Sequence, residues 1–142
     1  MQTDNHTSRW TIFNGVFSWG GPQQGWHQSR SIEVHPGDKI SSYVRYDSST
    51  QNYVMNIAAK GESVTTEFPA QGFVYDRAWF VLEHQGACGG YSSDGKVSFT
   101  DIIIEVEGKT VTPAWQAKQE QPVCGSEAHV ISPSEVTITW NP

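Results

Sequence analysis

The chain has 142 residues, a length typical of one domain, and a formal net charge of −6. Charged residues make up 17% of the chain and aromatic residues 12%, including six tryptophans, which argues against a disordered chain. An acidic chain without a basic run is unsuited to binding duplex nucleic acid, and no apolar stretch approaches the roughly 18 residues of a membrane span.

Apolar and polar residues alternate along most of the chain, which is typical of half-buried β-strands. In chain order, strands are expected at residues 10–17, 31–35, 40–46, 52–59, 64–68, 78–84, 97–106, 109–112 and 135–140. The best helical candidate, residues 114–121, is polar all round. Short strands separated by Gly, Pro, Asn and Ser turns predict an all-β, antiparallel β-sandwich of the jelly-roll or concanavalin-like type, formed by residues 1–142 as a single domain.

Metal and cysteine chemistry give few signals. The five histidines form no HxH or HExxH motif, so neither a metal site nor a cofactor is expected. Cys88 and Cys124 lie in Gly-rich loops outside any Cys-x-x-Cys motif, and the sequence leaves open whether they form one disulfide or two free thiols. The polar N-terminal residues contain no signal-peptide core, so the compartment also stays open.

Glu83 is the acid that stands out, because it sits in an otherwise apolar expected strand, on the face of Trp79 and Val81. A carboxylate beside a Trp-lined surface would be desolvated, and desolvation disfavours its charged form, which suits a general acid or base. The alternative is that Glu83 marks the end of the strand and points into water.

Aromatic and amide side chains crowd residues 10–28. Trp rings with Gln and Asn amides suit sugar rings or an extended peptide, since the ring packs while the amide donates and accepts hydrogen bonds. The alternative is that these tryptophans belong to the core of the sandwich. The residues predicted to bind a ligand are Trp19, Trp26, Trp79, Asn14, Gln24 and His27.

Several segments carry a resemblance to one protein family. The run AWFVLEHQ, followed by a Gly-rich loop and DGKVSFTDIIIEVEGKTV, is similar to that family's catalytic-Glu strand and the Val-x-Phe-Thr strand after it. SIEVHPGDKISSYVRYDSS, VFSWGGP and SEVTITW resemble three further segments of the family: I-x-x-x-x-GD-x-I-x-x-x-V, aromatic-Glu-Trp-Tyr-Pro and Val-Thr-Val-x-Tyr. The chain thus resembles, at low identity and over nearly its whole length, the eqolisins, which are glutamic peptidases of the scytalidopepsin type.

The resemblance implies a β-sandwich peptidase in which Glu83 is the catalytic Glu. An ungapped alignment from Trp19 towards the N-terminus places Met1-Gln2-Thr3 on the family's Leu-Gln-Thr motif, so Gln2 is implied as the catalytic Gln. In such a peptidase the carboxylate is the general base for a water that attacks the scissile carbonyl, and the Gln amide donates to the oxyanion. The resemblance also favours a secreted protein.

The chain departs from the family at several positions. Family members have a further N-terminal stretch, which includes a Trp-Val-Gly-Ile-Asp segment that lines the active site. Ser18 stands at the Glu of the Glu-Trp-Tyr-Pro element and Gly20 at its Tyr, while Gln85 replaces the aromatic residue two positions after the catalytic Glu.

Three functions follow as hypotheses. The first is a glutamic-peptidase-like hydrolase that acts at acid pH through Glu83. The second is a non-catalytic, lectin-like module that binds a glycan or a polypeptide in a Trp- and Gln-rich groove, and the third is another enzyme on this scaffold with Glu83 as acid or base. The expected ligand is a polypeptide or a glycan, with no nucleic acid and no membrane as partner. A sheet left uncovered at a shortened end also predicts burial by a second copy, in a homodimer.

Overall fold

The computed structural model describes residues 2–4, 9–19, 24–81, 88, 91, 93–118 and 123–141 of the chain. The regular elements in these residues are β-strands, apart from 3-10 conformation at Cys88 and in the short turn η2 (Val123–Gly125). The chain divides into two compact units, Met1–Arg77 and Ala78–Pro142, while the single domain expected from the sequence stays a prediction. Within the described ranges, no helix is long and apolar enough to cross a membrane.

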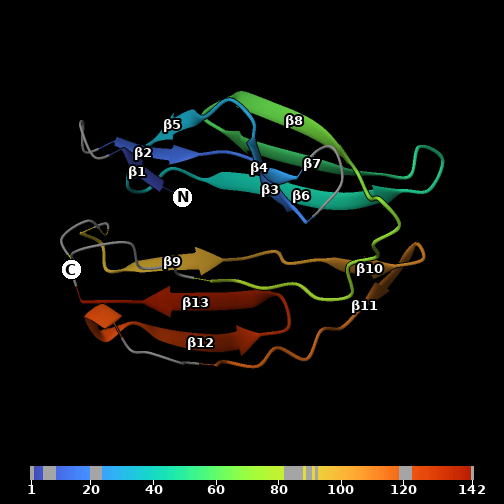
Figure 1. Ribbon diagram of the computed structural model, residues 1–142. Coiled ribbons are helices and arrows are strands. Elements are labelled where there is room, and N and C mark those ends of the chain that lie inside the picture. The colour runs from blue at the N-terminus through green and yellow to red at the C-terminus, as the bar shows by residue number, and fades with distance from the viewer. Residues whose placement is uncertain are drawn as a thin grey trace. The chain divides into compact units, whose positions relative to one another are not determined.

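The first unit consists of antiparallel strands (Figure 1). Three form the sheet β1-β2-β5, two form the hairpin β3–β4, and three form the sheet β6-β7-β8. Their bounds are β1 (Gln2–Asp4), β2 (Arg9–Ile12), β3 (Gly15–Ser18), β4 (Gly25–Gln28), β5 (Ile32–Val34), β6 (Ile40–Asp47), β7 (Asn52–Ala59) and β8 (Glu62–Pro69).

A two-residue turn fixes the register between β7 and β8. Lys60 and Gly61 both adopt positive φ angles, 54° and 78°, as a type I′ hairpin requires. Ala59 consequently lies opposite Glu62, and the pairing continues to Asn52 and Pro69 at the other end. Because opposite residues share a face of the sheet, this register decides which side chains can line a common surface.

The core of the first unit lies where β2 and β5 meet β7. Ile12, Ile32, Val34 and Ala59 are each at most 4% exposed. The strand β5 is buried at its first and third residues and exposed at the second, as the alternation of the sequence predicts. Trp10, Ile57 and Val64 pack against this cluster.

The second unit contains the antiparallel sheet β12-β13-β9 and a separate hairpin, β10–β11. The bounds of its strands are β9 (Lys96–Phe99), β10 (Ile104–Val106), β11 (Lys109–Val111), β12 (Glu127–Ser132) and β13 (Glu135–Thr139). Glu107 and Gly108, with φ angles of 52° and 73°, form the two-residue turn between β10 and β11.

Aromatic packing fills the second unit. Val136, Ile138 and Trp140 alternate along and just beyond β13, and all three are buried. Phe99 lies opposite Val136, and its ring centroid is 4.5 Å from that of Phe80. The ring of Trp115 packs edge-on against Phe80, while its indole N–H donates a 2.7 Å hydrogen bond to the carbonyl of Pro133.

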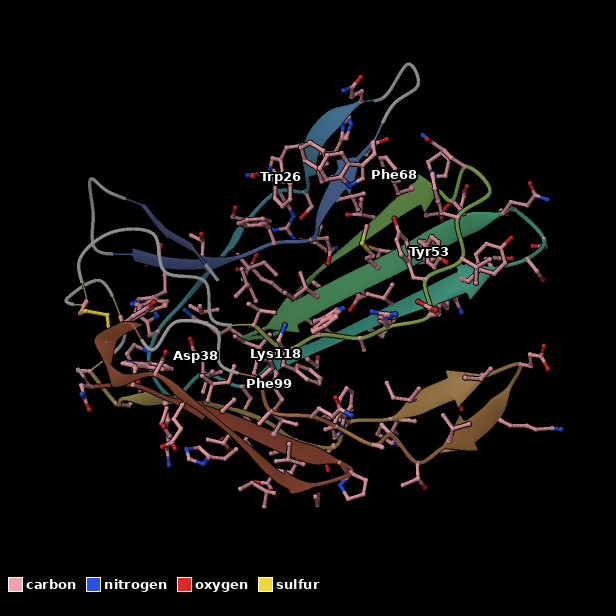
Figure 2. The ribbon with its side chains drawn as sticks, turned by 60° about the horizontal axis from the view of Figure 1, so that its bottom comes forward. Trp26, Asp38, Tyr53, Phe68, Phe99 and Lys118 are labelled. Atoms are coloured by element: carbon pink, nitrogen blue, oxygen red, sulfur yellow. A yellow bond between two sulfur atoms is a disulfide. The ribbon has the colours of Figure 1, made fainter. Side chains whose placement is uncertain are left out.

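The structure joins Cys88 to Cys124 in a disulfide, which settles the choice that the sequence left open. The bond spans 36 residues of sequence and appears as a yellow stick in Figure 2. It ties Cys88, five residues after Glu83, to η2, and disulfides of this kind persist in oxidising compartments.

Two expected strands are interrupted. Residues 10–17 give β2 and β3, because Asn14 turns its side chain inward and its backbone N–H donates to Ser29 Oγ (3.1 Å) instead of continuing a ladder. Residues 97–106 give β9 and β10, because Asp101 adopts a φ of 55°, which a regular strand does not accommodate.

Three strands were not expected from the sequence: β1, β4 and β12. The sequence of β4, GWHQ, does not alternate between apolar and polar residues, so the pattern does not predict a strand there. The strand β12 contains a register shift between Val130 and Ser132, which breaks the period of two. Of the expected strand at 78–84, residues 78–81 lie in no strand, and residues 82–84 lie outside the described ones.

Removing the disulfide should destabilise the protein. For a loop of 36 residues, the entropy that the cross-link removes from the unfolded chain corresponds to about 4 kcal/mol. We therefore expect the double substitution Cys88→Ala and Cys124→Ala to lower the free energy of unfolding by about 3–4 kcal/mol in urea titrations. A loss below about 1 kcal/mol would contradict a structural role for the bond.

Candidate functional site

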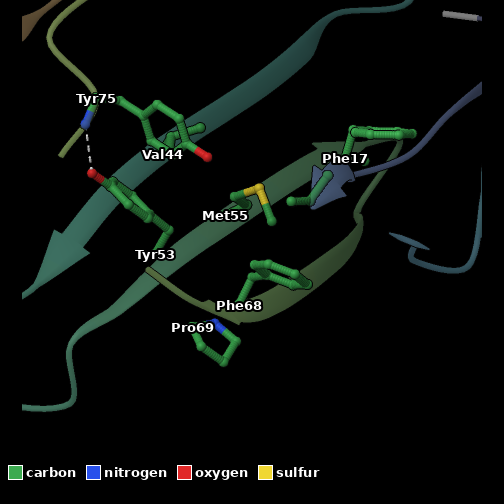
Figure 3. A pocket seen from close by; sticks show the side chains of 9 residues that line it. Phe17, Val44, Tyr53, Met55, Phe68, Pro69 and Tyr75 are labelled. Atoms are coloured by element: carbon green, nitrogen blue, oxygen red, sulfur yellow. Dashed lines mark hydrogen bonds between the residues drawn. The ribbon is translucent and has the colours of Figure 1, made fainter. Parts of the chain in front are cut away.

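A pocket of about 230 Å³ opens in the first unit (Figure 3). Its volume is below that of a typical drug-sized ligand site, so it suits a single side chain or ring. The residues that line it are Gly15, Val16, Phe17, Val44, Tyr53, Met55, Phe68, Pro69 and Tyr75.

The central strand β7 supplies the buried part of the pocket. Tyr53 and Met55 are 9% and 8% exposed and point to the same face of the sheet. The register places Val44 of β6 opposite Met55, and Phe68 of β8 opposite Tyr53, so both flank this surface. Figure 3 shows Tyr53 and Tyr75 on one side of Met55 and Phe17 on the other.

The phenol of Tyr53 holds the segment that follows β8 against the pocket. Its hydroxyl donates to the carbonyl of Phe73 (3.3 Å) and accepts from the backbone N–H of Tyr75 (2.9 Å). The ring centroids of Tyr53 and Tyr75 are 4.8 Å apart. Because the one polar group of Tyr53 is used inside the unit, its ring presents an apolar surface to a ligand.

The pocket is uncharged. Its nine lining residues include no Asp, Glu, His, Lys or Arg. Val44 and Tyr75 are 68% and 65% exposed, so the rim is open to water and apolar. Such a site can bind an apolar group by burying it, but its own side chains offer no general base at neutral or acid pH.

Asn14 connects the β3–β4 hairpin to the sheet beneath it. The side chain is 7% exposed, and its Nδ2 donates to the carbonyls of Met55 (3.3 Å) and Val64 (3.0 Å) and to Thr66 Oγ1 (3.2 Å). The amide hydrogens are therefore used within the fold, on β7 and β8. A role for Asn14 in binding a ligand stays a prediction.

The hairpin places the other predicted binding residues on different faces. Phe17 lies opposite Trp26, and Val16 opposite His27, so each pair occupies its own face. Both Trp26 and His27 are exposed, and the His27 ring packs 5.4 Å from Phe68 of β8 while Trp26 is 55% exposed. Trp19 is 78% exposed, and the side chain of Gln24 is also exposed.

The remaining predicted residues are distributed between the two units. Trp79 belongs to the second unit and is 67% exposed. The backbone of Gln2 pairs with Thr11 in the sheet β1-β2-β5 of the first unit. Glu83 lies outside the described residues, so its role stays a prediction.

Sequence reasoning missed the pocket itself. Alternation identified Tyr53 and Met55 as neighbours on one face of an expected strand. The residues that surround them come from β3, β6, β8 and the segment after β8. Only the strand register brings these segments together, and a single sequence carries no signal for it.

One cluster in the second unit resembles a nucleophile, base and acid, but its geometry is wrong. His129 Nε2 lies 3.2 Å from Thr139 Oγ1 and 3.6 Å from Glu127 Oε2. A hydrolase triad uses one ring nitrogen for the nucleophile and the other for the acid, whereas here the same nitrogen, Nε2, faces both groups.

Among the described residues, no group of three or more His, Cys, Asp or Glu could hold a metal ion.

Comparison with known proteins gives one informative finding. No family model and no curated protein matches the chain. The crystal structure of aspergilloglutamic peptidase from Aspergillus niger is similar to it, with a TM-score of 0.58 and 21% sequence identity. The similarity covers 92% of this chain and 87% of the peptidase chain.

This similarity shows the fold. The chain has the all-β, antiparallel β-sandwich fold of a glutamic peptidase, as predicted. The eqolisin resemblance seen in the sequence is thereby confirmed at the level of the fold, in a divergent form. A fold hosts many activities, so the reaction is a separate question.

The Asn14 amide gives a sharp test of how the hairpin is held. Asn14→Asp keeps the shape of the side chain but replaces its donors with an oxygen that faces two carbonyls. We expect the free energy of unfolding at pH 7 to fall by about 3 kcal/mol, and the loss to shrink at low pH, where a protonated carboxyl can donate.

Asn56→Asp is the matched control for this change. The Asn56 amide also reaches across to β8, where it donates to Thr65 Oγ1 (3.0 Å), but this bond is exposed. The control should change the free energy of unfolding by about 0.5 kcal/mol or less. Equal losses in the two variants would show that the buried amide has no special role.

Proposed function

We propose that this chain is a glutamic-peptidase-like hydrolase that cleaves polypeptides at acid pH, with Glu83 as its general base. The observation that carries the proposal is the likeness of fold to a glutamic peptidase over 92% of the chain. The sequence resemblance supports the assignment of Glu83 and Gln2 as the catalytic pair.

The proposed reaction is a general-base hydrolysis. The Glu83 carboxylate takes a proton from a water molecule as the water oxygen attacks the scissile carbonyl carbon. The Gln2 amide donates a hydrogen bond to the oxyanion that develops. Collapse of the tetrahedral intermediate breaks the C–N bond, and the proton held by Glu83 passes to the leaving amine. No metal or cofactor takes part in these steps.

The pocket of the first unit supports a polypeptide as the ligand. A peptide offers apolar side chains along a backbone of zero net charge, and the pocket lining is apolar and uncharged. Exposed apolar residues continue beyond the pocket at Phe73 (56% exposed) and Val74 (78%). A contiguous apolar area of this kind is typical of a surface that binds another molecule.

A second candidate, a non-catalytic binding module, is favoured by a different observation. The pocket contains no titratable group suited to catalysis, and exposed aromatic residues lie around it. Such a module would bind a peptide or glycan without cleaving it. A third candidate is another enzyme on this scaffold, with Glu83 as its acid or base. Such an enzyme would leave polypeptides intact and would convert a different substrate.

Cleavage of reduced and alkylated casein between pH 2 and 7 tests the proposal. We expect wild-type protein to cleave it at acid pH, and Glu83→Gln to lower kcat/KM by about 10²-fold or more, because the base is lost. Glu105→Gln is the matched control, since Glu105 is an exposed acid on β10, and it should retain full activity. Unchanged cleavage in Glu83→Gln contradicts the mechanism, and no cleavage by any form favours the binding module.

The pocket can be tested separately with peptides that differ at one position. In Glu83→Gln protein, a pentapeptide with a central Phe should bind about tenfold more tightly than one with a central Gly, because burying the ring is favourable. Val16→Phe should remove this preference by filling the pocket. Equal affinities for the two peptides in the unfilled protein would argue against a peptide at this pocket.

A further inference from the structure

The outer face of the β3–β4 hairpin is centred on Trp26, which is not among the residues that line the pocket. Two residues of this face, Gly15 and Phe17, do line the pocket. We define the outer hairpin face by Phe17, Trp19, Trp26 and Gln28. The register places Phe17 opposite Trp26 and Gly15 opposite Gln28. The intervening residues, Val16 and His27, point to the other face, where Val16 lines the pocket and His27 packs against Phe68.

Trp26 is held in place although it is 55% exposed. Its indole N–H donates a 3.0 Å hydrogen bond to Gln28 Oε1, and the edge of its ring system meets Phe13 at a centroid distance of 6.1 Å. A Cβ atom built on Gly15 would overlap the indole, so the ring lies across the glycine of the neighbouring strand. Figure 2 shows Trp26 on this hairpin.

Holding the exposed indole of Trp26 in one position costs conformational entropy. Gly15, the first residue of β3, contributes no side chain to the packing, and an exposed ring in one fixed position loses rotamer freedom. The core of the unit lies elsewhere, around Ile12, Ile32 and Val34, so the exposed indole adds little to it. A fixed, flat and accessible indole is instead what a stacking ligand needs, because its ordering cost is already met before binding.

The chemistry of the outer hairpin face favours an uncharged ligand with one apolar side. None of the residues 15–19 and 24–28 is Asp, Glu, Lys or Arg. The rings of Phe17 and Trp19 lie 4.5 Å apart and extend the aromatic surface beyond Trp26. Gln28 accepts from the indole through Oε1, and among the described residues its Nε2 makes no hydrogen bond, so a donor remains beside the ring.

We infer that the outer hairpin face is a binding platform for the pyranose rings of a neutral glycan. The C–H face of a sugar packs on an indole plane, while its hydroxyls pair with an adjacent amide. A charged polymer finds no counter-charge on this face, whereas a neutral polyol matches it. The inference is independent of the proposed hydrolysis, since it involves neither Glu83 nor Gln2, and its anchor, Trp26, does not line the pocket.

Affinity electrophoresis tests the platform with three neutral probes: hydroxyethylcellulose, barley β-glucan and galactomannan. At least one should retard the full chain, and Trp26→Ala should weaken that retardation about tenfold or more, as loss of an anchoring aromatic residue does. Gly15→Ala, which keeps Trp26 but displaces its ring, should weaken it similarly. Glu83→Gln should bind as the wild type does.

Tyr43→Ala is the matched control, because Tyr43 is a 47% exposed aromatic residue of the same unit on β6. It should leave the retardation unchanged. If Gly15→Ala fails to fold, as judged by near-UV circular dichroism, Trp26→Ala alone decides. The inference is overturned if none of the three probes retards the protein, or if Trp26→Ala binds as the wild type does. A concentration-dependent dimer that Trp26→Ala abolishes also overturns it, because the face is then covered by a second copy.

Discussion

The buried amide of Asn14 is the interaction on which the first unit depends. It joins the β3–β4 hairpin to β7 and β8 through Met55, Val64 and Thr66. The pocket and the outer hairpin face share this one hairpin. Val16 lines the pocket from one face, Gly15 and Phe17 reach it from the other, and Trp26 is presented to water. The hydrogen bonds of one buried side chain thus hold the hairpin on the sheet, because a buried amide tolerates only the geometry that satisfies it.

Much of the fold could be predicted from alternation alone. The strands expected at 40–46 and 52–59 correspond closely to β6 and β7, because both have regular side-chain patterns and end in strong turns. β12 escaped prediction since its bulge breaks the period, and the role of Asn14 escaped because its partners lie 41 to 52 residues away in sequence. The sequence could not decide whether Cys88 and Cys124 form a disulfide, because the two residues are 36 positions apart and only the fold brings their sulfur atoms together.

The candidate site was predicted less completely than the fold. The sequence grouped Trp19, Trp26, Asn14, Gln24 and His27 by proximity in the chain, but strand pairing separates them by face and by burial. Asn14 is buried, whereas Trp19, Trp26, Gln24 and His27 are exposed, and His27 also packs on Phe68. The pocket residues Tyr53, Phe68 and Tyr75 come from separate segments, so no local motif could mark them. The assignments of Glu83 and Gln2 rest on family resemblance, which proximity and periodicity do not supply.

The chain has the fold of a glutamic peptidase, and the pocket of its first unit is uncharged. The proposed function stands on the pairing of Glu83 with Gln2. A crystal structure of the protein with a bound, uncleaved peptide measures this most directly. If the proposal holds, the Glu83 carboxylate and the Gln2 amide will lie within about 3 Å of one shared water molecule beside the scissile carbonyl. A Glu83 side chain that points into bulk solvent, away from both the amide and the peptide, would contradict it.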